Sequence, residues 1–310
     1  MSELTNKTPG TVLASIVEVL TSDECLNCVC PPDYQQSPIP SQHNVEAIIG
    51  LCRAVIFPGF YGEWTLNSDN LAYSVGLNVE RLNRLLETEI AAAILMAEGR
   101  ECVEAAAVRL RAADIALKFI ESLPKLREAL NEDVEATYNG DPAALSQGEV
   151  ILCYPGIRAI VNHRVAHRLH ELGVPVLPRM IAERAHRETG IDIHPAATIG
   201  RAFMIDHGTG VVIGETAIIG DRVKIYQGVT LGARSFPTDE NNNAVKGLPR
   251  HPIIGDDVVI YANSTILGRI TIGSNSTVGG NLWVTRDLPP YSIALQANLE
   301  NSIRTKIQQS

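Results

Sequence analysis

The chain has 310 residues, of which 45% are apolar and 20% charged, as is typical of a soluble protein long enough for two domains. Its formal net charge of −9 argues against a nucleic-acid or anionic-membrane binder, because phosphate surfaces attract clustered Lys and Arg. No apolar run approaches the roughly 18 residues of a transmembrane helix, and the N-terminus lacks a signal-peptide layout. We therefore expect a cytoplasmic protein without nucleic-acid or membrane partners.

The N-terminal region contains a group of three cysteines. Cys25, Cys28 and Cys30 are crowded together and could hold a soft metal. A structural zinc site usually needs four ligands, and no fourth ligand is near in the sequence. With six cysteines in the whole chain, a disulfide scaffold is not indicated either. We expect reduced thiols and no bound metal.

The first 190 residues show apolar spacings of three and four, which indicate amphipathic helices. Residues 31–42 are rich in Pro, Ser and Gln and predict a loop or linker. The segment Gly140-Asp141-Pro142 should interrupt the helical pattern, since proline disfavours helical geometry in the residue before it. Helices are predicted over 11–20, 43–57, 78–98, 103–123, 125–139, 156–172 and 176–188.

After residue 190 an aliphatic residue returns every six positions, and glycine often follows it. A period of six fits neither the α-helix, with about 3.6 residues per turn, nor simple strand alternation. It is typical of a solenoid with three flat sides, in which the aliphatic side chains stack inside and a small residue fills the space beside them. The sequence therefore predicts a left-handed parallel β-helix. The aliphatic positions are Ile193, Ile199, Ile205, Ile213, Ile219, Ile225, Leu231, Ile254, Ile260, Ile266, Ile272, Val278 and Val284, and the small positions are Ala197, Ala217, Val223, Val229, Val258, Ser264 and Ser276.

The six-residue phase breaks twice. Ile205 and Ile213 are eight positions apart, and a long excursion separates Leu231 from Ile254. A solenoid accepts insertions only as loops at its corners, and such loops usually serve a site. The polar pairs within these two breaks are Asp206-His207 and Arg250-His251.

Five motifs follow one another in the second half of the chain: DIHP (192–195), IDHGTG (205–210), VIGETA (212–217), VTLG (229–232) and RHP (250–252). With the helices before them, they make the chain resemble the serine acetyltransferases over about residues 130–290. The resemblance implies transfer of acetyl from acetyl-CoA to the hydroxyl of L-serine, which gives O-acetyl-L-serine and CoA, the first step of cysteine biosynthesis from serine. It implies an α-helical domain over 1–190, a left-handed β-helix acetyltransferase domain over 191–290 and a tail over 291–310.

The resemblance also implies a catalytic pair. His207 matches the general base of the family, which takes the proton of the serine hydroxyl during attack on the thioester. Asp192 matches the carboxylate that pairs with this histidine and stabilises its charged form. The two residues are fifteen positions apart, which is compatible with neighbouring rungs at about 4.8 Å.

The remaining matches concern binding of the acceptor and the donor. Asp141 and Asp206 match the carboxylates that hold the serine ammonium, and Arg250 matches the residue that pairs with the serine carboxylate. His251 lies beside Arg250 in the same pocket. Positions whose main chain contacts the pantetheine arm of CoA are matched by Gly232, Ala233 and Ala262. The resemblance implies acetyl-CoA as co-substrate and no metal.

The family shares its site between subunits, so the resemblance implies a homo-oligomer, a trimer or a hexamer. Many members end in an isoleucine that docks in cysteine synthase. Here the last residues are Gln309 and Ser310, which makes that complex doubtful. Feedback inhibition by cysteine, which uses the serine pocket in the family, stays open.

Three alternatives also stay open. The acceptor could be another small hydroxyl compound, such as homoserine or a sugar. The chain could instead be a non-catalytic assembly partner that kept the scaffold. A metal hydrolase of the hexapeptide type would need three histidines that converge across an interface, for which His194, His207 and His251 are the candidates.

Overall fold

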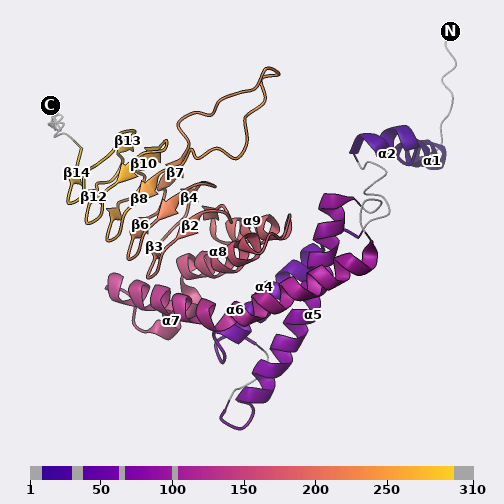
Figure 1. Cartoon of the computed structure of the whole chain (residues 1–310), viewed down its shortest axis with the longest axis horizontal. Coiled ribbons are helices and arrows are strands. Elements are labelled where there is room, and N and C mark those ends of the chain that lie inside the picture. The colour runs from indigo at the N-terminus through magenta and orange to yellow at the C-terminus, as the bar shows by residue number, and fades with distance from the viewer. Residues whose placement is uncertain (1–8, 30–37, 63–66, 100–103, 297–310) are drawn as a thin grey trace, which may run out of the picture.

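The computed structural model describes residues 9–29, 38–62, 67–99 and 104–296 (Figure 1). Cys30, the side chain of Cys28 and the tail from residue 297 lie outside these ranges, so the predicted thiol group is not described as a whole. Within these ranges, the regular elements up to Thr189 are helices, and fourteen short strands follow.

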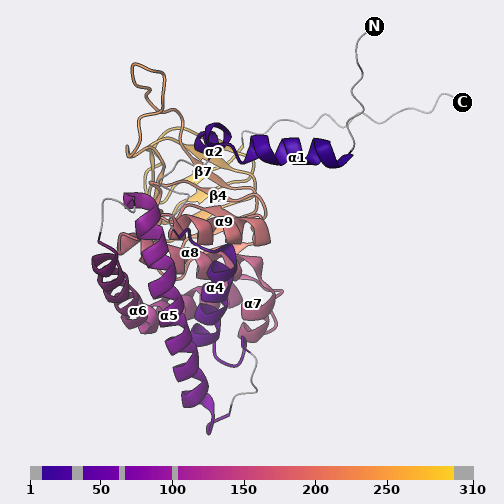
Figure 2. The same cartoon turned by 90° about the vertical axis from the view of Figure 1, so that its right-hand side faces the viewer.

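The helices are α1 (Pro9–Leu20), α2 (Asp23–Val29), α4 (Gln42–Ile56), α5 (Leu71–Glu98), α6 (Ala105–Gly140), α7 (Gln147–Cys153), α8 (Pro155–Glu171) and α9 (Leu177–Thr189). Helices α4, α5 and α6 pack on one another, while α8 and α9 pack together and against the first coil of the solenoid. Helix α1 projects away from this body and buries none of its residues (Figure 2). None of the helices in the described ranges is long and apolar enough to cross a bilayer.

The helices differ from the prediction in three ways. Helix α5 begins at Leu71, seven residues before the predicted start at residue 78. Helix α6 runs through Pro124 as one element, although two helices were expected there. The side chains of Phe119, Leu123 and Leu130, on either side of the proline, are buried and hold the helix in place despite the lost backbone hydrogen bond. Helices α2 and α7 were not predicted, because seven residues are too few to show a helical period.

The strands build a three-sided parallel solenoid, and the predicted left-handed β-helix is confirmed. The first sheet has the order β1-β4-β7-β10-β13, the second β2-β5-β8-β11 and the third β3-β6-β9-β12-β14. The strands are β1 (Asp192–Ile193), β2 (Thr198–Ile199), β3 (Met204–Asp206), β4 (Val212–Ile213), β5 (Ile218–Ile219), β6 (Lys224–Tyr226), β7 (Thr230–Gly232), β8 (Ile253–Ile254), β9 (Val259–Ile260), β10 (Thr265–Leu267), β11 (Thr271–Ile272), β12 (Thr277–Val278), β13 (Trp283–Val284) and β14 (Ile293–Ala294).

The core of the solenoid follows the predicted repeat. Every predicted aliphatic position from Ile193 to Val278 is buried, and so is every predicted small position. Val284, in the last coil, is half-buried. The inward stacking therefore extends through the whole solenoid except its last coil.

Strand register shows where the two insertions enter. Val212 pairs with Thr230, 18 positions later, which is the regular coil. Asp192 pairs with Val212, 20 positions later, so the first coil contains two extra residues. Thr230 pairs with Thr265, 35 positions later, because the long loop that stands out in Figure 1 is inserted after β7. Both insertions lie at corners and leave the strand pairing intact.

A buried ion pair joins the helices to the first coil. Arg164 of α8 donates to both carboxylate oxygens of Asp133 on α6, at 2.6 Å and 2.8 Å. The same carboxylate accepts the backbone N–H of Phe203 at 2.9 Å, and Arg164 also donates to the carbonyl of Gly200 at 2.8 Å. The Asp133–Arg164 ion pair thus fixes α6 and α8 to each other and to the corner before β3.

We predict that Arg164→Met lowers the melting temperature strongly. The substitution leaves the Asp133 carboxylate buried without its cation, a loss on the order of 3–5 kcal/mol. Scanning calorimetry at matched protein concentration measures the change. The control is Arg222→Met, which breaks the exposed Arg222–Asp257 pair and should leave the melting temperature nearly unchanged. Equal melting temperatures for the two variants would contradict the role assigned to the buried pair.

Candidate active site

The first cluster of polar side chains lies at the corner between β3 and β4, where the two extra residues are inserted. His207 directly follows β3 with a left-handed backbone, φ 56°, which few residues with a Cβ adopt. Its side chain is 72% exposed, and its Nδ1 lies 3.9 Å from Oδ1 of the buried Asp206. The insertion therefore places an imidazole on the outside of the solenoid, beside a carboxylate held within it.

The C-terminus of α6 brings Asp141 to this corner. Its carboxylate accepts the Ala143 N–H at 2.8 Å and the Tyr154 hydroxyl at 2.7 Å. These two hydrogen bonds lower the pKa of Asp141, and the nearby charges of Lys224 and His207 lower it further. The same contact with Asp141 raises the pKa of Tyr154 to about 12. The residue that follows α6 thus reaches the corner of the β-helix, as the predicted role of Asp141 requires.

Lys224 lies near both carboxylates. Its Nζ donates to the carbonyl of Gly140 at 2.7 Å and lies 3.9 Å from Oδ2 of Asp206. Neither Lys224 nor Tyr154 was among the predicted site residues. The sequence carried little signal for them, since a lysine on the outer face of a strand and a tyrosine before a helix are common.

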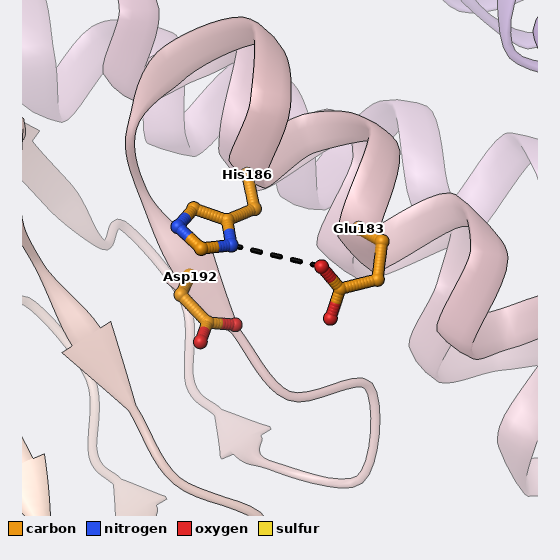
Figure 3. A group of neighbouring side chains, drawn as sticks. All are labelled: Glu183, His186 and Asp192. Carbon is orange, nitrogen blue, oxygen red and sulfur yellow. Dashed lines mark ion pairs between the residues drawn. The ribbon is translucent and has the colours of Figure 1, made fainter.

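Asp192 lies on the other side of the same corner, and its carboxylate faces α9. One of its oxygens is within 4.8 Å of ligand atoms of Glu183 and His186 (Figure 3). Across the part of the chain that the structure describes, no hydrogen bond or ion pair joins Asp192 to His207. The nearest backbone contact is with a later part of the same corner: the N–H of Asp192 donates to the carbonyl of Val211, four residues after His207, at 2.9 Å.

Among the described residues, Glu183, His186 and Asp192 form a group whose ligand atoms are close enough to contact one metal ion together. Glu183 and His186 are exposed, and Glu183 is already paired with Arg179 at 2.5 Å. Of the histidines considered for a metal hydrolase, His194 lies near His251, whereas His207 is at another corner. Within one chain, these three histidines do not form a ligand set.

The second cluster lies at the corners between the first and second sheets. Arg250, at the end of the long loop, pairs with Glu215 at 2.7 Å. Thr216 Oγ1 accepts the backbone N–H groups of Arg250 at 2.9 Å and His251 at 3.1 Å. Arg269 donates to the carbonyls of Thr216 at 2.6 Å and His251 at 3.0 Å. The VIGETA segment thus fixes the loop end that carries the predicted carboxylate-binding arginine.

His251 is held as a neutral imidazole. Its Nδ1 accepts the Thr216 N–H at 3.0 Å, so the proton of the neutral ring belongs on Nε2. Burial and then the adjacent Arg250 cation lower the pKa of His251 from 6.5 to about 4. Burial also lowers the pKa of the neighbouring His194. At neutral pH His251 therefore offers an N–H donor without a charge.

The predicted CoA-binding residues are divided between the same two edges of the solenoid. Gly232 ends β7 and is followed by Ala233, at the edge that carries Arg250. Ala262 follows β9, two rungs beyond His207 on its edge, and its carbonyl accepts the N–H of Asn281 at 2.9 Å. The predicted site residues therefore lie along two edges of the solenoid, which we call the His207 edge (corners from the third sheet to the first) and the Arg250 edge (corners from the first sheet to the second).

The chain is similar to known proteins both in sequence and in fold. Residues 251–286 match the family model described as bacterial transferase hexapeptide (six repeats). A plasmid serine acetyltransferase of Synechococcus elongatus is 48% identical over 267 residues, which cover 85% of this chain and 84% of that protein. Serine acetyltransferase 1 of Entamoeba histolytica, solved in complex with L-cysteine, has a TM-score of 0.70 at 35% identity over 81% of this chain and 86% of its own. Soybean serine acetyltransferase complexed with serine has a TM-score of 0.53 at 31% identity over 84% and 98% of the two chains.

We predict that protein stability falls as the pH is lowered from 6.5 towards 4, in part through His251. In this window the unfolded chain binds a proton at this residue and the folded protein does not, so acidification favours unfolding. His251→Asn keeps an acceptor for the Thr216 N–H and removes the titration. The decrease in melting temperature between pH 7 and pH 5 should be smaller in the variant, and identical decreases would contradict this prediction.

Proposed function

The chain belongs to the serine acetyltransferase family, and we propose that its acetyl donor is acetyl-CoA and its general base His207. As a serine acetyltransferase it is an enzyme, not a non-catalytic assembly partner. The observation that supports the proposed site best is the convergence of Asp141 and Asp206 beside His207. Asp141 follows the end of α6 and Asp206 lies in β3, so two separate elements bring these carboxylates together.

The acceptor is L-serine, held by its two charges. Asp141 and Asp206 accept hydrogen bonds from its ammonium, which points its hydroxyl at His207. Arg250 binds its carboxylate through two parallel hydrogen bonds, which a planar guanidinium favours. The neutral His251 beside it adds an N–H donor. A zwitterionic acceptor suits this arrangement better than a sugar, which offers neither charge.

The reaction needs one proton relay. His207 takes the proton of the serine hydroxyl as the oxygen attacks the thioester carbonyl carbon of acetyl-CoA. The tetrahedral intermediate collapses with cleavage of the C–S bond, and the imidazolium returns the proton to the departing CoA sulfur. Asp192, on the other side of the same corner, turns its carboxylate from α9 towards His207 in this step and stabilises the imidazolium. The products are O-acetyl-L-serine and CoA, and atoms and charge balance without a metal.

We further propose that the functional unit is a homotrimer or a pair of trimers. The His207 edge and the Arg250 edge are separated by the width of the first sheet, so one serine molecule cannot contact both on one subunit. In a threefold assembly, one edge of each subunit faces the other edge of its neighbour. The pantetheine arm of CoA then lies in the groove between them, along Gly232 and Ala233 of one subunit and Ala262 of the next.

L-cysteine is proposed as a competitor for the serine pocket. It carries the same ammonium and carboxylate as serine, so Asp141, Asp206 and Arg250 would bind both molecules. The Entamoeba histolytica relative was solved in complex with L-cysteine. Inhibition that additional serine relieves would support a shared pocket.

We predict that His207→Ala lowers kcat with L-serine about 10²-fold to 10⁴-fold, the usual contribution of a general base. The assay follows free thiol release from acetyl-CoA, with homoserine and a galactoside as alternative acceptors. Asp206→Asn is the matched variant, and we expect it mainly to raise KM for serine. A loss below tenfold in His207→Ala would overturn the assigned base, and faster turnover of another acceptor would overturn the substrate.

Mixed oligomers test whether the site is shared. His207→Ala and Arg250→Ala subunits, each nearly inactive alone, are co-expressed with different tags and purified as mixed oligomers. A site shared by neighbours combines an intact His207 with an intact Arg250 in about a quarter of random pairings, so substantial activity should return. A site contained in one subunit would leave the mixture as inactive as its components.

A further inference from the structure

Lys224 lies near both carboxylates that are proposed to hold the ammonium of the acceptor. It stands on β6, in register with Met204 of β3, and its side chain is 21% exposed. Its ammonium group donates to the carbonyl of Gly140, the residue before Asp141, at 2.7 Å. The same group is 3.9 Å from Oδ2 of Asp206 and 4.8 Å from the ring centre of Tyr226. Lys224 therefore contacts the end of α6, strand β3 and an aromatic face.

The corner needs a cation for an electrostatic reason. Asp141 and Asp206 are two acidic side chains that reach this corner from separate elements, and like charges brought together repel each other. The last carbonyls of α6 add the negative end of a helix dipole at the same place. Without a cation between them, the end of α6 and the end of β3 would repel each other. Lys224 supplies that charge from a strand that is hydrogen-bonded to β3.

The geometry points to Lys224 as a positioning residue of the acceptor site, which holds Asp141 and Asp206 within reach of one substrate ammonium. This inference rests on the proposed function, because it takes the two carboxylates as the ammonium site. Lys224 has no role in the proton transfer itself. It leaves the pair of carboxylates with one uncompensated negative charge, which matches the single positive charge of the acceptor's amino group.

The test compares Lys224→Met with Lys224→Arg and with the wild-type protein. In Lys224→Met the carboxylates are no longer held together, so we expect KM for L-serine to rise about tenfold, the effect of losing one charged hydrogen bond. The value of kcat should change less than about threefold, since His207 is untouched. Lys224→Arg can still donate to Gly140 and pair with Asp206, and it should restore most of the affinity.

An acceptor analogue separates positioning from a general loss of structure. 3-Hydroxypropionate is serine without its amino group, so its binding does not depend on the ammonium site. Calorimetric titration should show weaker L-serine binding in Lys224→Met and unchanged 3-hydroxypropionate binding. Arg222→Met, two positions earlier on the outside of the solenoid, is the control and should match the wild type for both ligands.

Three other outcomes would overturn the inference or the proposed function. Equal weakening for both ligands, or no rescue by Lys224→Arg, would overturn the inference in favour of a purely structural lysine. Tighter serine binding in Lys224→Met would also overturn it, because the lysine would then compete with the substrate ammonium. A wild-type protein that binds serine but does not acetylate it would refute the proposed function, while the binding comparison would still decide the role of Lys224.

Discussion

The inward stacking of one aliphatic side chain every six residues is the constraint on which the rest of the structure depends. Because Ile193, Ile213 and Leu231 stack in one column, and equivalent columns fill the other two sides, no strand can lengthen or slip without exposing its neighbours. Extra residues can enter only at corners. The two extra residues at His207 and the long loop before Arg250 both do so, and these corners carry the proposed chemistry.

The helical region contributes more than a cap on the first coil. The Asp133–Arg164 pair fixes α6 and α8 to the corner before β3, and this sets where α6 ends. Asp141 follows that end directly, so a buried ion pair eight residues upstream determines the position of a surface carboxylate. Lys224 of β6 donates to Gly140, and Tyr154, the residue before α8, donates to Asp141, so two further elements hold the end of α6. The ammonium site proposed here is therefore a product of the junction between the two regions.

The sequence was sufficient where the chemistry repeats. The hexapeptide period predicted the solenoid, its core and the corner positions of Asp206-His207 and Arg250-His251, and the family predicted from the motifs is confirmed. It was insufficient where a contact depends on side-chain placement across elements. Lys224 and Tyr154 do not belong to the repeating positions, so the hexapeptide period does not identify them. The orientation of Asp192 towards α9 depends on the path of that helix. Tertiary packing allows α6 to continue through Pro124, which the sequence alone does not indicate.

The left-handed backbone of His207 has a consequence for how this corner can change. Asparagine and glycine adopt such a conformation most readily, and a histidine does so at a cost in folding free energy. The residue at this position is therefore one that conformational preference alone would not select. Replacing it by glycine would relax the turn and make the protein more robust, while removing the imidazole. A substitution that stabilised this turn would therefore remove the proposed general base, so stability and the proposed activity make opposite demands on this one residue.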